Sequence, residues 1–138
     1  MPQEFVALAV MGIDQHENGI FAVSRVLMES QIQVEYLGTC MTPQQVAKRA
    51  IELGVDVVGI SCHSWEYMTL VPQLLEELEG RNANIEVILG GSVITPSDAL
   101  HMRRQGVAAV FTDIADSQDL VDCVRGLAAK RGNVPGDA

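Results

Sequence analysis

Short apolar segments of strand length alternate along the chain with longer segments in which apolar residues recur at helical spacing. Strands are predicted over residues 5–11, 33–37, 55–61, 85–89 and 107–111. Helices are predicted over residues 19–30, 42–54, 67–79, 95–106 and 117–130. Regular alternation of strands and helices indicates a parallel sheet whose strands are joined by helices.

Local signals support the helix boundaries. Thr42 can cap a helix whose first residue is Pro43, and Gln45 completes a capping box. Gly54 is expected to close that helix. Pro72 is expected in the first turn of the following helix, where its missing N–H costs little.

Five strands and five helices predict a three-layer, doubly wound α/β domain of the flavodoxin-like (Rossmann-like) class, with the parallel strand order 2-1-3-4-5. We expect residues 1–138 to form a single domain, with a frayed tail over 132–138. In such a sheet the ligand site lies beyond the carboxyl ends of the strands, at the switch between strands one and three.

The composition argues against two kinds of binding partner. The chain is 48% hydrophobic and 20% charged, with a net charge of −9, so neither a nucleic-acid backbone nor an anionic membrane surface is an expected partner. It shows no signal peptide and no apolar run of spanning length. Cys40, Cys62 and Cys123 are predicted to be reduced thiols in a cytoplasmic protein, and Cys40 and Cys123 to be small buried hydrophobes.

Candidate ligand-binding residues follow three of the predicted strands. Asp14-Gln15-His16-Glu17-Asn18-Gly19 follows the first, Ser61-Cys62-His63-Ser64 the third, and Gly90-Gly91 the fourth. His16 can offer an imidazole to a metal, and Asp14 can hold the other ring nitrogen. Paired glycines let a bulky group approach the main chain closely. This edge therefore suits a large ligand with a metal centre and a long appendage.

The spacing Asp14-x-His16-x-x-Gly19, then Ser61 after 41 residues, then Gly90-Gly91, resembles the signature of cobalamin-binding domains in which a histidine displaces the cofactor's own base. The resemblance extends over about residues 5–130. It is strongest to the cobalamin-binding domain or small subunit of acyl-CoA mutases of the methylmalonyl-CoA and 2-hydroxyisobutyryl-CoA type.

The resemblance implies that the cofactor is adenosylcobalamin and that His16 is the lower axial ligand of its cobalt, with Asp14 bonded to the imidazole. It also implies cofactor-binding roles for Gly19, Ser61, His63, Gly90 and Gly91 around the nucleotide tail. The chain would then be a subunit of an isomerase with no catalytic residue of its own. A large barrel-shaped partner subunit would hold the acyl-CoA substrate during the radical carbon-skeleton rearrangement.

The sequence departs from this family pattern at two places. His63 stands where the family usually has leucine, and residues 112–115 lack the glycine-rich turn common after strand five.

Other functions remain open at this stage. They are a corrinoid methyl carrier, which usually has a helical segment before strand one, a cobalamin sensor or carrier, and a zinc module using His16, Cys62 and His63. A receiver-type signalling domain shares the fold, but its acidic pair after strand one and its lysine after strand five are absent.

Overall fold

The computed structural model describes residues 4–12, 17–62, 64–112 and 117–132. Its strands form one parallel sheet in the order β2-β1-β3-β4-β5, which confirms the predicted topology. The strands are β1 (Phe5–Met11), β2 (Gln33–Met41), β3 (Val57–Ser61), β4 (Glu86–Gly90) and β5 (Ala109–Phe111). The helices are α1 (Asn18–Glu29), α2 (Pro43–Leu53), α3 (Tyr67–Gly80), α4 (Pro96–Gln105) and α5 (Ser117–Gly132).

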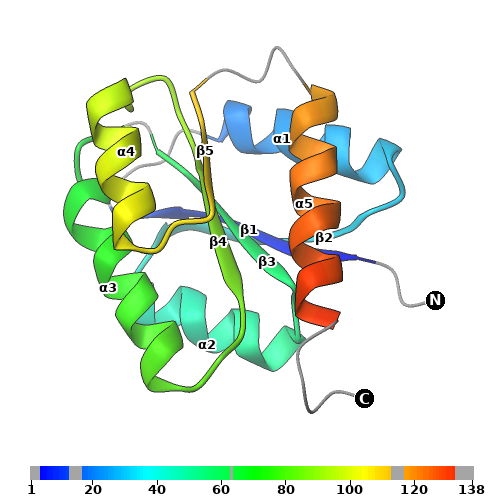
Figure 1. Ribbon diagram of the computed structural model, residues 1–138, viewed down its shortest axis with the longest axis horizontal. Helices are drawn as coiled ribbons and strands as arrows, with labels where there is room; N and C mark the ends of the chain where they lie inside the picture. The colour runs from blue at the N-terminus through cyan, green and yellow to red at the C-terminus, as the bar shows by residue number, and fades with distance from the viewer. Residues whose placement is uncertain (1–3, 13–16, 63, 113–116, 133–138) are drawn as a thin grey trace.

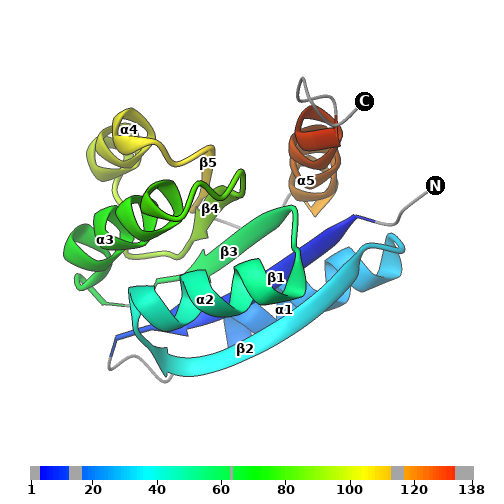
Figure 2. The ribbon, with the colours of Figure 1, turned by 90° about the horizontal axis from the view of Figure 1, so that it is seen from below.

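The sheet separates two hydrophobic cores, because alternate side chains of each strand point to opposite faces. Helices α2, α3 and α4 cover one face, while α1 and α5 cover the other (Figures 1 and 2). On β1, Ala7 and Ala9 face the first core, and Val6, Leu8 and Val10 face the second. The central strands are therefore buried on both faces, as their continuous apolar sequences predict.

Two predicted strands begin too early, for one shared reason. Val55 and Val107 each follow the glycine that ends a helix, and each N–H bonds back to a helix carbonyl, that of Ala50 at 3.3 Å and that of Met102 at 3.1 Å. The side chains of both valines, of Ala50 and of Met102 are buried. These valines therefore make the apolar contact of a helix C-terminus, although from sequence they look like the first residues of strands.

The second strand is longer than predicted, since β2 continues to Met41 and not only to residue 37. Gly38 and Cys40 adopt positive φ values of 126° and 57°. Shifts in the pairing with β1 occur in the same region, so that Met11 still pairs with Met41. With these irregularities, β2 continues to pair with β1 beyond residue 37, where the predicted strand ended.

The predicted place of Pro72 is wrong. It lies inside α3, which begins five residues earlier at Tyr67, so it is beyond the first turn. A proline there has no N–H to donate to the carbonyl four residues before it. Burial of the neighbouring Val71 and Leu74 compensates by packing α3 against the sheet.

The remaining boundary signals are confirmed. Thr42 and Gln45 form the capping box at the start of α2, with bonds of 3.1 and 3.0 Å. Gly54 ends that helix in the left-handed conformation, with φ 72°.

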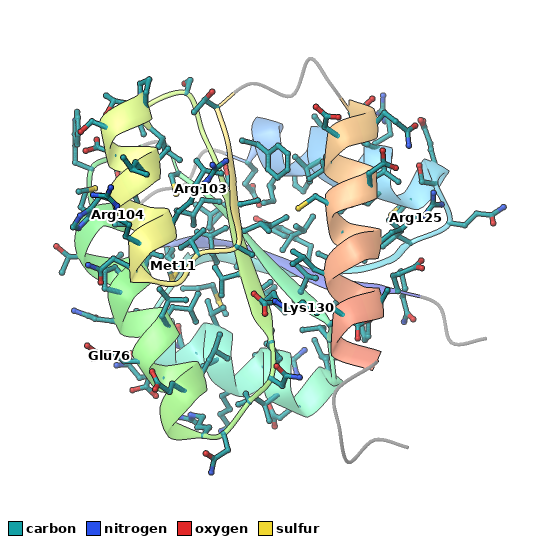
Figure 3. The ribbon with its side chains drawn as sticks, viewed as in Figure 1. Met11, Glu76, Arg103, Arg104, Arg125 and Lys130 are labelled. Atoms are coloured by element: carbon teal, nitrogen blue, oxygen red, sulfur yellow. The ribbon has the colours of Figure 1, made fainter. Side chains whose placement is uncertain are left out.

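Arg125 reaches from α5 to the carbonyl of Ser30 at 2.8 Å and so ties α5 to the end of α1 (Figure 3). Among the described residues, no helix has the length and apolar character needed to cross a bilayer.

We predict that Thr42→Ala lowers the free energy of unfolding by about 1 kcal/mol, because both capping-box bonds depend on this residue. Gln44→Ala, an exposed change two residues along, is the control and should stay within about 0.5 kcal/mol of the wild type. Urea denaturation of the three proteins measures the difference. Equal midpoints for the two variants would contradict the capping role.

Candidate functional site

At the carboxyl edge of the sheet, small residues occupy adjacent positions on the face covered by α1 and α5. Strand pairing places Leu8, Gly59 and Ile88 in one row across β1, β3 and β4. The row nearer the edge contains Ser61 paired with Gly90, which in turn pairs with Phe111. Gly59, Ser61 and Gly90 thus lie together on one face and leave space between the sheet and the helices.

That space is a cavity of about 270 Å³. The sheet residues above form its floor, and the helices and the strand ends close its sides with Gly19, Ile20, Val23, Gly91, Ser92, Thr112 and Leu120. Most of these side chains are aliphatic. Protein interiors contain few voids larger than a water molecule, so an apolar opening of this size is typical of a ligand site.

Gly91 permits a close contact between two loops at the rim of this cavity. A Cβ atom on Gly91 would lie 2.0 Å from the carbonyl oxygen of Cys62, which is far inside contact distance. The backbone there is also bonded, from Cys62 N to Gly90 O at 2.8 Å and from Gly91 N to Phe111 O at 3.0 Å. The strand ends of β3, β4 and β5 are therefore held together through main-chain contacts.

Gly90 has a different role from its neighbour. A Cβ on Gly90 would have Phe111 O as its nearest contact, at an ordinary 3.5 Å. Because Gly90 shares the parity of Ile88 on β4, its missing side chain faces the cavity. Gly91 is thus required by the backbone, while Gly90 keeps the cavity open.

The structure brings four of the predicted site residues into one cavity: Gly19, Ser61, Gly90 and Gly91. Ser61 is buried, with 9% of its surface exposed. Asp14, His16 and His63 lie outside the described residues. Cys62 is buried in the core against α2 and α3, on the opposite face of the sheet from Ser61.

Sequence reasoning missed the depth of the cavity. Leu8, Gly59 and Ile88 extend it beneath α1 and α5, whereas the residues predicted from sequence lie nearer the carboxyl ends of the strands. Gly59 was the available signal, because a glycine inside a buried strand marks a close approach or a missing side chain. Even so, a Cβ at Gly59 would lie 2.7 Å from Cδ2 of Leu8, so Gly59 also makes room for a side chain of the floor.

Two tyrosine–carboxylate hydrogen bonds flank the site. The Tyr36 hydroxyl of β2 donates to Oε2 of Glu17, the residue before α1. The Tyr67 hydroxyl of α3 donates to Oδ2 of Asp98 in α4 at 3.1 Å. Burial, followed by the carboxylate partner, raises the pKa of Tyr67 to about 12 and that of Tyr36 still higher. Both hydroxyls therefore remain donors at neutral pH.

Near the site, one cysteine prediction is wrong, and two aromatic residues differ in their exposure. Cys40 is exposed, because the irregular end of β2 turns it outward, while Cys123 is partly buried. Trp65 is 63% exposed beside the site, whereas Tyr67 is 3% exposed and belongs to the core. His101 lies on the exposed face of α4.

Residues 5–119 match the B12 binding domain family, a span that includes β1 to β5 and every described residue of the cavity lining except Leu120. The chain belongs to the B12-binding domain family. The expected fold and the expected cofactor class, cobalamin, are therefore confirmed together.

Two relatives define its place among B12-binding domains. The chain is 35% identical to the 2-hydroxyisobutanoyl-CoA mutase small subunit of Aquincola tertiaricarbonis over 127 residues, which cover 92% of this chain and 93% of that protein. It is 36% identical to the methylmalonyl-CoA mutase large subunit of Streptomyces virginiae over 133 residues, which cover 93% of this chain but 18% of that protein. The B12-binding domain thus corresponds to a nearly whole small subunit and to a small part of a large one.

Solved structures agree on the fold. A cobalamin-binding protein from Desulfitobacterium hafniense superposes with a TM-score of 0.77 at 19% identity, over 91% of this chain and 59% of that one. At this level of identity the likeness shows the shared architecture alone.

The cavity fits one arm of a cobalamin and not the whole cofactor. About 270 Å³ is near the lower limit for small-molecule sites. Its aliphatic walls would suit the flat benzimidazole base, and the backbone and hydroxyl of Ser61 are polar groups in the same lining. A corrin ring is too large for this space and would have to lie outside, beyond the strand ends.

We predict that Gly90→Ala weakens hydroxocobalamin binding by about tenfold while changing the melting temperature little, because the added methyl group enters the cavity without a backbone clash. Binding of cobinamide, which lacks the nucleotide arm, should be unchanged. Absorption titrations with the two corrinoids measure the effect.

Gly91→Ala is the matched comparison, since its methyl group would meet the Cys62 carbonyl. We expect it to lower the melting temperature and to weaken both corrinoids. If Gly90→Ala binds cobalamin as the wild type does, the cavity does not hold the nucleotide arm.

Proposed function

We propose that this chain is the cobalamin-binding small subunit of an adenosylcobalamin-dependent acyl-CoA mutase, and that it acts with a separate large subunit that holds the acyl-CoA. One observation carries the proposal. The match covers 92% of this chain and 93% of a mutase small subunit, but only 18% of a large mutase subunit. The chain would therefore contribute the cofactor site to an isomerase whose substrate site lies elsewhere.

In this proposal His16 is the lower axial ligand of cobalt, and Asp14 accepts a hydrogen bond from the imidazole and fixes its orientation. Gly19 leaves room at the start of α1 for the nucleotide arm, and Ser61 hydrogen-bonds it. Gly90 and Gly91 form the side of the slot that has no side chains. His63, two residues after Ser61, adjoins the same arm.

The cofactor supplies homolysis of its cobalt–carbon bond, the step that starts radical rearrangement. The residues of this chain bind and orient the cofactor, and the aliphatic walls of the slot exclude water from its nucleotide arm. None of the proposed site residues is assigned to proton transfer or to the substrate. None of the three cysteines forms a disulfide, which is in keeping with the proposed cytoplasmic location.

Removal of the axial ligand tests the proposal directly. We predict that wild-type protein changes the absorption spectrum of hydroxocobalamin as an imidazole replaces the cofactor's own base, and that His16→Ala loses this change and binds at least about a hundredfold more weakly. His101→Ala, a change on the exposed face of α4, is the control and should bind as the wild type does. A spectrum that His16→Ala leaves unaltered would exclude histidine ligation.

The role of His63 is tested in the same titration. We predict that His63→Leu, which restores the residue usual in the family, strengthens cobalamin binding and leaves cobinamide binding unchanged. The physical reason is that an aliphatic side chain matches the apolar slot better than an imidazole. Weaker cobalamin binding in His63→Leu would mean that the imidazole itself contacts the nucleotide arm.

Mixing the loaded subunit with a large mutase subunit tests the partner. Acyl-CoA isomerisation should need both proteins. Tight cobalamin binding without isomerisation, together with methyl transfer to an acceptor, would favour a corrinoid methyl carrier. Zinc bound in place of cobalamin would contradict the proposal.

A further inference from the structure

The segment that carries the proposed cobalt ligand is short in sequence, and the residues on either side of it make contacts that the structure describes. It spans residues 13–16, between Gly12 at the end of β1 and Glu17 at the start of α1. Whatever fixes these two ends limits where an imidazole on residue 16 can lie. The contacts at Gly12 and Glu17 are therefore relevant to metal ligation.

The first end is fixed by the main chain. The N–H of Gly12 donates to the carbonyl of Met41 at 2.9 Å, which joins the end of β1 to the end of β2. Gly12 has a φ of 77°, and a Cβ there would lie 2.8 Å from Oε2 of Glu66. The position therefore favours glycine for its conformation, and the end of the flexible Glu66 side chain lies over it.

The second end is fixed by a side chain. Glu17 occupies the N-cap position of α1, yet its side chain makes no capping bond to the helix. Its carboxylate instead accepts the hydrogen bond of the Tyr36 hydroxyl, from a residue of β2 nineteen positions away in sequence. A glutamate at this position gives up the capping bond that serine, threonine or aspartate would make, and it gains a link to the sheet.

Tyr36 is itself well held. Its backbone pairs with Leu8, a residue of the cavity floor. The ring of Phe21, from the first turn of α1, contacts the Tyr36 ring edge-on, with centroids 5.3 Å apart and planes at 74°. This geometry is a favourable aromatic contact. Glu17, Phe21 and Tyr36 together therefore join the first turn of α1 to a rigid strand.

We propose that Tyr36 is a positioning residue for the axial histidine: by holding Glu17, it keeps the adjoining His16 loop in the arrangement that ligates cobalt. The inference rests on the proposed function, because it takes His16 as the ligand. Only one peptide bond separates Glu17 from His16. Without the Tyr36 bond the loop samples more arrangements, and apparent affinity falls with the fraction that is competent to ligate.

Cobinamide is the suitable probe, since it has no nucleotide arm and no base of its own. Its binding depends on the axial ligand and not on the slot beneath α1 and α5. In the cobalt(II) form, a nitrogen ligand splits the electron paramagnetic resonance lines, and labelling the protein with nitrogen-15 changes each triplet to a doublet. The measurement therefore reports ligation by a protein nitrogen, without any enzyme activity.

We predict that Tyr36→Phe, which removes only the hydroxyl and keeps the contact with Phe21, binds cobinamide about tenfold to a hundredfold more weakly than the wild type. At subsaturating protein, the fraction of cobalt with nitrogen splitting should fall accordingly. Glu17→Ala should reproduce this loss. Glu17→Gln should retain most of the affinity, because its amide oxygen can still accept the Tyr36 hydrogen bond.

Tyr67→Phe is the matched control, because it removes a second tyrosine–carboxylate bond that joins α3 to α4 and not the histidine loop. It should lower stability comparably and leave cobinamide binding and the nitrogen splitting unchanged. The two Glu17 variants keep the inference testable if Tyr36→Phe does not fold, since they alter the same hydrogen bond from its acceptor side.

The outcomes separate this inference from the function on which it rests. If wild-type protein shows no nitrogen splitting with cobinamide, histidine ligation is excluded and the inference is excluded with it. If the wild type shows the splitting and Tyr36→Phe and Glu17→Ala match it, only the positioning role is wrong. Equal losses in Tyr36→Phe and Tyr67→Phe would also overturn it, because the effect would then be one of general stability.

Discussion

The cavity depends on one constraint, which is that three neighbouring positions on one face of the sheet carry almost no side chain. Gly59, Ser61 and Gly90 are brought together by the parallel pairing of β3 with β4. On the other face the same strands present Val58, Ile60 and Leu89, which are fully packed against α2, α3 and α4. One face of the sheet is thus fully packed, and the other leaves a recess. The helices above the recess close it without filling it.

The recess is paired with a rigid rim. Main-chain bonds between the ends of β3, β4 and β5 and the absence of a side chain at Gly91 allow these strand ends to approach closely. A site built from backbone and strand residues keeps its shape better than one built from loops alone. At the start of α1, next to the proposed metal ligand in sequence, a side-chain hydrogen bond joins the helix to the sheet, from Tyr36 of β2 to Glu17.

In the proposed function, the reaction is divided between two subunits. The cavity of this chain would hold one arm of the cofactor in an aliphatic slot, with the corrin beyond the strand ends and accessible to the large subunit. A domain of this kind can be a separate small subunit, as in the Aquincola tertiaricarbonis relative, or part of a longer chain, as in the Streptomyces virginiae one. Trp65, largely exposed beside the site, lies on the same accessible edge.

The sequence alone determined the class of fold, the strand order and the edge at which the site lies. Hydrophobic periodicity and the capping signals at Thr42, Gly54 and Thr95 are local, and local patterns survive without knowledge of tertiary contacts. The family signature also identified Gly19, Ser61, Gly90 and Gly91, which the structure brings to one cavity. Those residues lie at fixed distances from strand ends, so topology alone brings them together.

Tertiary structure decided the rest. Val55 and Val107 pack as helix ends because their amides bond backward, which no apolar pattern reveals. The depth of the slot depends on which residues of β1, β3 and β4 stand side by side, and that is a matter of register. The bond from Tyr36 to Glu17 joins two residues whose sequence signals are unrelated. The depth of the slot and the bond from Tyr36 to Glu17 are relations between segments distant in the chain, and such relations are set only when the strands pair.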